Sequence, residues 1–331
     1  MRKTELIRNY IKKFPNTPST TLSKKIYAEN MELFTNQETV RSLIRYTRGL
    51  SGKAKRKHIT DEFKVKPFSL DKNPFHIPKS DAQKQSFFTL PQKDNNILLI
   101  SDLHIPYHDI PALTCAIKYG KEKNVNTVFI NGDLIDFYPI SRFVNVERKR
   151  SVSEELQIVK EILGILRREF PDAEFYFLMG NHDNRLETYL ATKAPELLDV
   201  EEFRLEYLLE CEKYGVKIIK DNTLVRAGKL HITHGHLLIK GIFAPVNPAR
   251  GAFLRAKDSI LISHVHNSSS HTEKTIKGKL ITCYSTGCLC ELSPTYNPFG
   301  NNFGHGFAHI TIEPNGHYKV DNKRIIDGEI Y

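Results

Sequence analysis

Histidine and aspartate recur in five short clusters along the chain, and each cluster follows a run of apolar residues. Imidazole and carboxylate groups are ligands that first-row divalent metals prefer, and an amide oxygen can complete such a set. The clusters, in chain order, are Asp102-Leu103-His104, Gly132-Asp133-Leu134-Ile135-Asp136, Gly180-Asn181-His182-Asp183, His234-Gly235-His236 and His264-Val265-His266. Two cations about 3.5–4 Å apart, bridged by one oxygen ligand, can clamp the attacking and leaving oxygens of a displacement at phosphorus. The clusters therefore predict a two-metal site suited to phosphoester chemistry.

The apolar run before each cluster predicts the element that positions it. "NILLISD" (96–102) predicts a buried strand that ends at Asp102, and "NTVFINGD" (126–133) and "AEFYFLMGNHD" (173–183) repeat the arrangement. Helices are predicted between these strands, at 109–121 and at 152–170. Strands that alternate with helices indicate parallel pairing, and ligands of such sheets gather beyond the carboxyl ends of the strands. We therefore expect the clusters to meet at one edge of a sheet.

The part of the chain after residue 220 has a different pattern, with several short strands and few helices. The strands are predicted in "TLVRAGKLHITHGH", "DSILISHVH", "GKLITCYST" and "FAHITIEPNGHYKV", which end at residues 236, 266, 286 and 320. Strands this close together indicate a second, more antiparallel sheet. The two parts together predict an α/β sandwich of two sheets.

The first 66 residues differ from the rest in charge. They hold 16 Lys and Arg against 6 Asp and Glu, whereas residues 67–331 hold 32 of each kind. Three short helices are predicted here, the second capped by Thr20 and the third beginning after Thr35 or Asn36. On the third helix three arginines share one face: Arg41, Arg45 and Arg48. This pattern favours a helix-turn-helix-like module that binds nucleic acid, and the alternative is a solvated basic face on a helical appendage.

Length and composition suggest how the chain is organised. A chain of 331 residues favours one large domain with a smaller one, here a basic helical module at 1–66, a proline-containing linker at 67–95 and a main domain at 96–331. No stretch is apolar enough for a membrane span or a signal peptide, which predicts a cytoplasmic protein without a membrane partner. The five cysteines form no CxxC pair. They are interpreted as small core residues, with Cys288 and Cys290 as an alternative metal half-site.

The five clusters, in this order and spacing, resemble those of the calcineurin-like metallophosphoesterases over residues 96–331. The resemblance implies a four-layer α/β/β/α sandwich with two divalent metal ions, Mn²⁺ foremost and Fe, Zn, Ni or Mg as alternatives. It implies that His182 protonates the leaving oxygen, or binds the scissile phosphate, and that Asp136 hydrogen-bonds His182. Carried over motif by motif, one metal is held by Asp102, His104 and His266, the other by Asn181, His234 and His264, and Asp133 bridges them.

The sequence departs from the family pattern at several positions. Protein phosphatases of this superfamily carry an arginine and a glycine after the aspartate that corresponds to Asp136, whereas Phe137 and Tyr138 stand here. Ser263 replaces a glycine, which is tolerated if its backbone angle is ordinary. The run 141–150 carries four cations that could grip phosphate or could be the solvated start of a helix. These departures argue against the interpretation of the protein as a phosphoprotein phosphatase.

Three functions are compatible with these features. The first is a phosphodiesterase or nuclease whose DNA or RNA substrate is delivered by the basic module. The second is a phosphatase or phosphodiesterase on nucleotides or other small molecules, and the third is a nucleic-acid-binding protein with a vestigial metal site. The basic segment together with the metal motifs also resembles phage-encoded phosphoesterases, which predicts a site of action in the host cytoplasm. The metal, the cleavage polarity and the oligomeric state are left open by the sequence.

Overall fold

The computed structural model describes residues 2–51, 78, 80, 86–141, 151–239, 246–294 and 299–331. The chain divides into two compact units, an N-terminal unit (Met1–Ala82) and a C-terminal unit (Gln83–Tyr331). Each unit has buried apolar clusters of its own. Within the described residues, no helix combines the length and the apolar character needed to cross a membrane.

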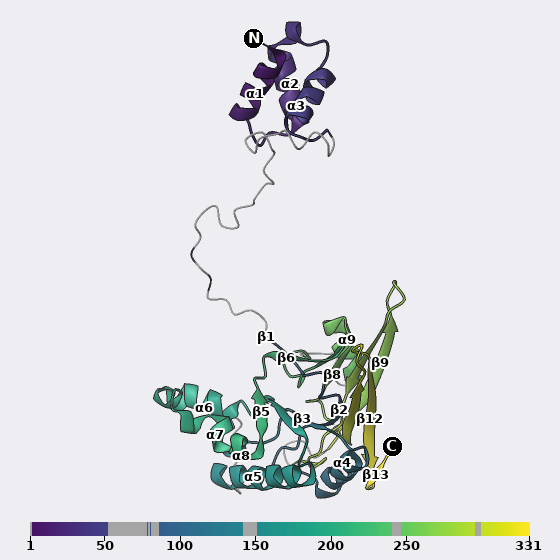
Figure 1. Cartoon of the computed structure of the whole chain (residues 1–331). Helices are drawn as coiled ribbons and strands as arrows, with labels where there is room; N and C mark the ends of the chain where they lie inside the picture. The colour runs from purple at the N-terminus through teal and green to yellow at the C-terminus, as the bar shows by residue number, and fades with distance from the viewer. Residues whose placement is uncertain are drawn as a thin grey trace. The chain divides into compact units, whose positions relative to one another are not determined.

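The N-terminal unit contains the three predicted helices (Figure 1). Their bounds are α1 Lys3–Lys13, α2 Ser19–Glu29 and α3 Gln37–Thr47, with a short 3-10 turn η1 at Met31–Leu33. The side chain of Asn36 caps α3 by accepting a hydrogen bond from the Thr39 amide at 2.9 Å. The expected cap of the second helix is wrong, because α2 starts after Pro18 and Thr20 lies within it. Apolar faces of the helices meet in a small core that includes Leu6, Ile7, Ile11, Leu22, Ile26, Val40 and Ile44.

The first sheet of the C-terminal unit has seven strands in the order β13-β12-β11-β2-β3-β4-β5. Its parallel strands are β2 Asn96–Ile100, β3 Thr127–Asn131, β4 Glu174–Leu178 and β5 Val216–Ile219. Its antiparallel strands are β11 His305–Ile312, β12 Tyr318–Ile326 and β13 Glu329–Ile330. The parallel strands carry the first three sequence clusters, each beyond a carboxyl end.

The second sheet has six strands in the order β1-β6-β7-β8-β10-β9. Their bounds are β1 Ser86–Thr89, β6 Thr223–Ala227, β7 Leu230–Ile232, β8 Ile260–Ile262, β9 Ser269–Lys274 and β10 Leu280–Ser285. The expectation of a mainly antiparallel sheet is wrong, because β1 and β6, β7 and β8, and β8 and β10 pair in parallel. Parallel pairing brings the carboxyl ends of β7 and β8 together, where the last two clusters follow.

Two strands expected in the second sheet belong to the first. β11 pairs with β2 in a register that joins Ile310 to Ile97, and β12 continues outward from β11. Alternation along the sequence predicts a strand but not its partner, which here is set by long-range packing. The buried side chains of Ala308 and Ile310 lie in the core between the two sheets.

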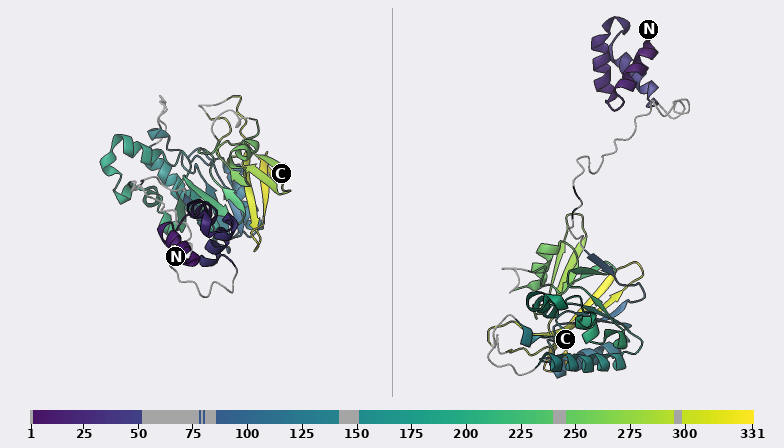
Figure 2. Two further views of the ribbon diagram at one scale, coloured as in Figure 1. Left: turned by 90° about the horizontal axis from the view of Figure 1, so that it is seen from above. Right: turned by 90° about the vertical axis from the view of Figure 1, so that its left-hand side faces the viewer.

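The layers follow from which face each side chain takes. On β2, Ile97 and Leu99 lie in the core between the sheets, whereas Leu98 and Ile100 pack under the helices α4 (Ile110–Glu122) and α5 (Val152–Glu169). On the far side, helix α9 (Pro248–Ala256) packs against the second sheet. The views from different sides show α5 and α9 on opposite faces of the unit (Figures 1 and 2). The predicted four-layer α/β/β/α sandwich is confirmed.

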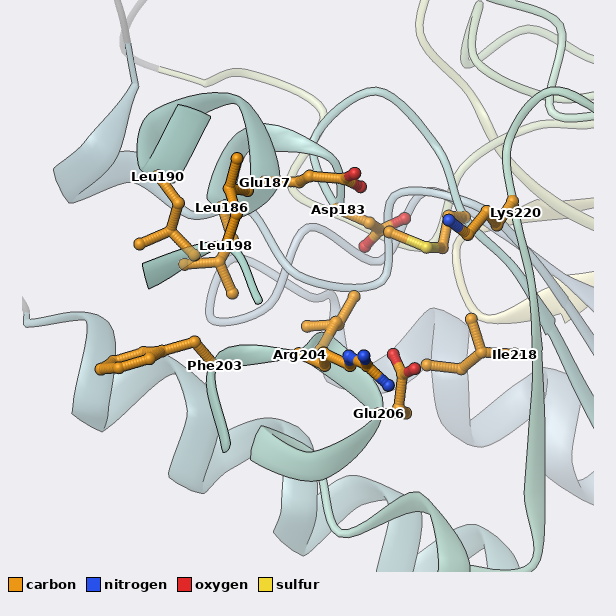
Figure 3. Close-up of a pocket in the computed structure, with 12 residues that line it drawn as sticks. Asp183, Leu186, Glu187, Leu190, Leu198, Phe203, Arg204, Glu206, Ile218 and Lys220 are labelled. Atoms are coloured by element: carbon orange, nitrogen blue, oxygen red, sulfur yellow. The ribbon is translucent and has the colours of Figure 1, made fainter. Parts of the chain in front are cut away.

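Short helices connect β4 to β5. They are α6 Arg185–Lys193, η5 Pro195–Leu197, η6 Glu201–Phe203, α7 Leu205–Leu208 and α8 Cys211–Tyr214. A pocket of about 650 Å³ lies among them, with Leu190, Leu198 and Phe203 on one side and charged side chains such as Arg204 and Lys220 on another (Figure 3). Asp183 also lines this pocket, so the connection lies directly behind the third cluster.

Part of the segment expected to be linker is structured. Residues 86–89 form β1, which pairs with β6 from Ser86↔Thr223 to Thr89↔Arg226. Phe88 packs with its ring centroid 5.6 Å from that of Tyr176 in the sheet opposite. These contacts bind the end of the segment to the sandwich. Residues 67–77, 79 and 81–85 lie outside the described part.

Candidate metal centre

The five clusters begin directly after the carboxyl ends of β2, β3, β4, β7 and β8. Three strands come from the first sheet and two from the second, so the site lies across one edge of the sandwich. Two groups of potential ligand atoms share Asp133 and lie within 4.8 Å of one another: His104 with His182, and His234 with His264. The fold thus brings together residues more than 100 positions apart in the sequence.

The backbone of this edge is unusual. Asp102, His104, Asp133, His264 and His266 all have positive φ, between 45° and 73°. Residues other than glycine rarely adopt this backbone conformation, because it costs of order 1–3 kcal/mol per residue. Such residues are concentrated at functional sites. Ser263 is not among the positive-φ residues, so a serine is accommodated where the family has glycine.

Two glycines leave the space that the cluster needs. A Cβ on Gly132, whose φ is +85°, would lie 2.2 Å from Nδ1 of His234. A Cβ on Gly180 would lie 2.3 Å from Oδ1 of Asp133. Both positions therefore require glycine for the loops to approach so closely.

Asp133 is at the centre of the cluster and is almost fully buried. Its Oδ2 lies 3.1 Å from Nε2 of His234 and 3.7 Å from Nε2 of His104. Its Oδ1 accepts a hydrogen bond from the His182 amide at 2.8 Å. Burial opposes its ionisation, but the surrounding histidines hold its pKa well below the usual value. The residue thus offers a carboxylate at a point that both groups of ligand atoms share.

Two further groups of atoms lie on either side of Asp133. On one side, Nε2 of His266 lies 3.2 Å from Nε2 of His104 and 3.3 Å from Oδ1 of Asp102. On the other side are His234 and His264. Asn181 directly precedes His182 in the chain, and its side-chain oxygen is buried. Two imidazoles and a carboxylate, and two imidazoles and an amide, are the donor sets that first-row divalent metals favour.

Buried atoms without hydrogen bonds test whether the cluster fits metal ions. Oδ1 of Asp102, Oδ1 of Asn181 and Nε2 of His234 are buried and make no hydrogen bond. Leaving such groups unpaired costs about 1–3 kcal/mol each, so native structures rarely do so without a bound partner. All three atoms have lone pairs that can bind a cation, and Asp102 and His234 belong to the groups on either side of Asp133. The residues present therefore fit two divalent cations.

Neighbouring groups orient the histidines for such a role. Nδ1 of His234 lies 2.8 Å from the carbonyl oxygen of Asn131, which can only accept, so Nδ1 carries the proton and Nε2 faces Asp133. Nδ1 of His104 donates in the same way to Oδ1 of Asp136 at 3.0 Å. Cys290 lies behind His266, with its Sγ 4.0 Å from Nδ1, on the side away from Asp102. Sγ of Cys290 forms a further group of potential ligand atoms with His104 and His266, and the buried Cys288 also interacts with His266.

A second network connects the cluster to His182. Asp136 Oδ1 accepts from Nδ1 of His182 at 2.8 Å as well as from His104. Burial alone would raise the pKa of Asp136, but these two hydrogen bonds hold it well below the usual value. Arg185 Nη1 donates to the Asp136 carbonyl at 2.7 Å, and Arg185 Nη2 lies 3.0 Å from Nε2 of His182. His182 is therefore fixed on both ring nitrogens.

Arg185 and Asp183 show what the motifs alone missed. Arg185 begins α6 three residues after His182, and this spacing on the sequence is the signal that could have found it. Asp183 accepts a hydrogen bond from the Gly180 amide within its own turn at 2.7 Å. It also accepts from the amides of Asp133, Leu134 and Ile135, at 2.8–3.2 Å. It therefore binds the second and third clusters to each other.

A family model described as calcineurin-like phosphoesterase matches residues 96–285. The chain belongs to this family. The resemblance expected from the motifs is confirmed, and the protein is a hydrolase of the metallophosphoesterase class. Gene 54 proteins of Mycobacterium phages L5 and D29 are 27% and 26% identical over 243 and 245 residues, which is 70% of this chain and 94% of each relative. The structure of vacuolar protein sorting 29 from Cryptosporidium parvum aligns at 16% identity with a TM-score of 0.39, over 72% of this chain and 94% of that one.

The arginines expected to contact nucleic acid differ in exposure in this phosphoesterase. Arg45 is exposed, and Arg41 is partly exposed and lies 3.2 Å from Glu38. Arg48 is buried, and its guanidinium donates to the carbonyl oxygens of Phe14, Pro15 and Thr17. The expectation for Arg48 is therefore wrong, because its side chain turns inward to bind the loop between α1 and α2. The cations at 142, 148, 149 and 150 lie outside the described residues.

Proposed function

We propose that this phosphoesterase hydrolyses phosphodiester bonds in DNA or RNA with two divalent metal ions, most simply Mn²⁺. The observation that carries the proposal is Asp133, a buried carboxylate between two sets of donors, each of which includes a buried atom without a hydrogen bond: Oδ1 of Asp102 and Nε2 of His234. One ion would be held by Asp102, His104 and His266, and the other by Asn181, His234 and His264. When bound, such a pair polarises the phosphoryl group and lowers the pKa of the attacking water.

The residues around His182 supply the proton chemistry. His182 lies at the rim of the cluster, where a ring nitrogen can give a proton to the leaving oxygen as the ester bond breaks. Asp136 holds the ring through Nδ1 and favours its charged form, so that Nε2 can carry the proton once the Arg185 guanidinium, which donates to it here, moves away. Arg185 lies beside Nε2 and can take up a phosphate oxygen when substrate displaces it from the ring. Positioning by these three groups therefore favours breaking the bond to the departing oxygen.

The substrate is inferred from charge. The excess positive charge of the protein lies in residues 1–66, and Arg45 presents its side chain to solvent from α3. Lysine and arginine near phosphates release counterions and give a sequence-independent affinity for nucleic acid. The N-terminal unit is therefore proposed to bind the polymer on which the C-terminal unit acts. The phage relatives support a site of action in the cytoplasm of a bacterial host.

A smaller substrate, a nucleotide or another phosphoester, is the second candidate. A compact pocket of about 140 Å³ beside His104 and Asp136 favours it, because a small ligand could fill that space unaided. A nucleic-acid-binding protein with a vestigial site is disfavoured, since both donor sets are complete.

The test is a substrate screen with Mn²⁺ that includes single-stranded DNA, duplex DNA, RNA, cyclic nucleotides and a chromogenic diester. The proposal expects cleavage of a polynucleotide with a higher kcat/KM than any nucleotide. The Asp133→Asn variant should lose hydrolysis and part of its bound metal, measured by elemental analysis, while circular dichroism stays unchanged. Hydrolysis of cyclic nucleotides alone, or full activity in Asp133→Asn, would contradict the proposal.

A further inference from the structure

A small pocket opens beside the metal centre on the side of His104 and Asp136. Its volume is about 140 Å³, and its other lining residues are Tyr107, Tyr138, Cys290, Glu291, Ser293 and Pro294. The residues that protein phosphatases use after the second cluster are absent here, and Phe137 and Tyr138 take their place. Tyr138 therefore lines the pocket from a position that holds no proposed metal ligand.

Two tyrosines form the aromatic wall of this pocket. Their ring centroids lie 6.4 Å apart in an edge-to-face arrangement at 79°. The amide of Tyr107 donates to the carbonyl of His104 at 2.8 Å, which fixes this platform relative to the proposed metal ligand. Tyr138 follows Phe137, whose side chain is fully buried in the core beneath the sheet. Both rings are thus held by backbone that also holds the catalytic cluster.

The pocket also has polar groups that can make further hydrogen bonds. The hydroxyl of Tyr138 is buried and makes no hydrogen bond. The carboxylate of Glu291 is exposed, and one of its oxygens accepts from the Ser293 amide at 3.0 Å. The amide of Glu291 donates to the carbonyl of Tyr107 at 2.8 Å, so the acidic group is fixed beside the aromatic wall. A ligand here would meet a flat π-surface together with a hydroxyl and a carboxylate.

We propose that this pocket is a base subsite, in which the nucleobase next to the scissile phosphate stacks on the ring of Tyr107, with the ring of Tyr138 against its edge. The inference rests on the proposed function, because it assumes a phosphoester with a nucleoside attached to the reacting phosphorus. A nucleobase matches the pocket in three respects: it has a π-face for stacking, in-plane donors for Glu291, and a position one sugar away from phosphorus. The carboxylate disfavours a second phosphate group, and it favours bases with an exocyclic amino group over those with carbonyl oxygens alone.

The test compares two chromogenic esters that share a leaving group. One is p-nitrophenyl methyl phosphate, and the other is the p-nitrophenyl ester of cytidine 5′-monophosphate. Stacking on an aromatic side chain is worth enough per base that Tyr107→Ala should lower kcat/KM for the nucleoside ester about 5- to 150-fold. The methyl ester should change by less than about 2-fold on the same reasoning, because it has nothing to stack. Tyr107→Phe should keep the stacking and stay close to the wild type on both esters.

Tyr189 provides a matched control. It is as exposed as Tyr107, at 41%, and it lies on α6 outside this pocket. Tyr189→Ala should leave both esters unchanged, and circular dichroism of both alanine variants should match the wild type. An equal fall on both esters in Tyr107→Ala overturns the proposal, since the pocket would then hold the shared aryl group. No change on either ester overturns it as well.

A binding measurement separates this inference from the proposed function. Saturation-transfer NMR with cytidine 5′-monophosphate should show transfer to the base protons in the wild type and loss of that transfer in Tyr107→Ala. If the wild type hydrolyses neither ester but shows this difference, the proposed function fails and the base subsite stands. If no transfer reaches the base in the wild type, the base subsite fails whatever the protein hydrolyses.

Discussion

At the scale of single residues, one carboxylate oxygen connects the metal centre to the proposed acid. Oδ1 of Asp136 accepts hydrogen bonds from both His104 and His182, one a proposed ligand and the other the proposed proton donor. A carboxylate shared in this way fixes both rings and keeps Nδ1 protonated on each. The ligand and the donor are therefore positioned relative to each other by a single side chain.

His182→Ala tests the role of this donor. If His182 protonates the leaving oxygen, kcat on an alkyl diester should fall on the order of 10²–10⁴-fold. The loss should be much smaller on p-nitrophenyl esters, whose leaving group needs no proton. Steady-state kinetics on both ester types, with metal content measured beside them, provides the check. Equal losses on the two would show that His182 positions substrate instead.

Glu155 gives the site a pH-dependent effect on stability. Its side chain is fully buried on α5, and burial with the nearby Asp136 carboxylate raises its pKa to about 8. A raised pKa means that the neutral form stabilises the folded protein. That stability is present below the unfolded pKa of 4.5 and is lost as pH rises to about 8. The neutral carboxyl group of Glu155 thus stabilises the fold at low pH. Its ionisation destabilises the fold as the pH becomes alkaline.

Glu155→Gln should remove this dependence. Between pH 4.5 and 8 the free energy of unfolding of the wild type should fall relative to the variant by about 3–5 kcal/mol. Glutamine keeps the shape and cannot ionise, so it serves as a permanently neutral replacement. Urea unfolding of both proteins at several pH values measures the difference. If the free energy of unfolding had the same pH dependence in both proteins, the pKa of Glu155 would be the same in the folded and unfolded states, which would contradict the prediction.

At the scale of elements, the sequence predicts the positions of the strands better than their partners. The ends of β2, β3 and β4 could be predicted because each apolar run stops at residues with metal-binding chemistry. The placement of β11 and β12 could not, since it depends on the register with β2 rather than on local pattern. Arg185 was missed because its only sequence signal is its position three residues after His182, which has meaning only once a helix is known to begin there.

Arg48 shows the same limit in the N-terminal unit. Spacing predicts that Arg41, Arg45 and Arg48 share one face, but Arg48 lies just after α3, and spacing cannot show which side chains reach solvent. Three backbone carbonyls at the α1–α2 loop have the lone pairs that attract the guanidinium inward. The physical role of Arg48 is therefore to close the helical bundle.

Arg48→Ala should destabilise the N-terminal unit, and Arg45→Ala should not. Removing the charged donor from these partly buried hydrogen bonds should cost about 1.5–3 kcal/mol, whereas exposed substitutions usually change stability by less than about 0.5 kcal/mol. Hydrogen exchange of peptides from α1, α2 and α3 in the full chain measures the stability of this unit separately from that of the sandwich. Equal exchange in the two variants would contradict the structural role of Arg48.

At the scale of the whole molecule, the chain joins a metal-dependent hydrolase to a helical unit with all of the excess charge. The C-terminal unit has its proposed ligands beyond the ends of strands from two sheets. The N-terminal unit has its own core and exposed cations. The proposed division of roles predicts that mutations in the N-terminal unit change binding of a polymer, and that mutations in the C-terminal unit change cleavage of the bond.

The double variant Arg41→Ala/Arg45→Ala tests delivery of the substrate, with Arg48 kept so that the bundle stays folded. Each lost phosphate contact should flatten the slope of log affinity against log salt by about 0.9, and two contacts by up to about 2 units. KM for a long polynucleotide should rise while kcat stays nearly constant, the pattern expected when binding unrelated to the transition state is lost. Hydrolysis of a small diester should not change. A control with two exposed arginines of the C-terminal unit replaced, Arg168→Ala/Arg324→Ala, removes the same charge elsewhere and should keep the wild-type slope. Identical slopes in all three proteins would leave the basic face as solvated surface and favour a nucleotide as the substrate.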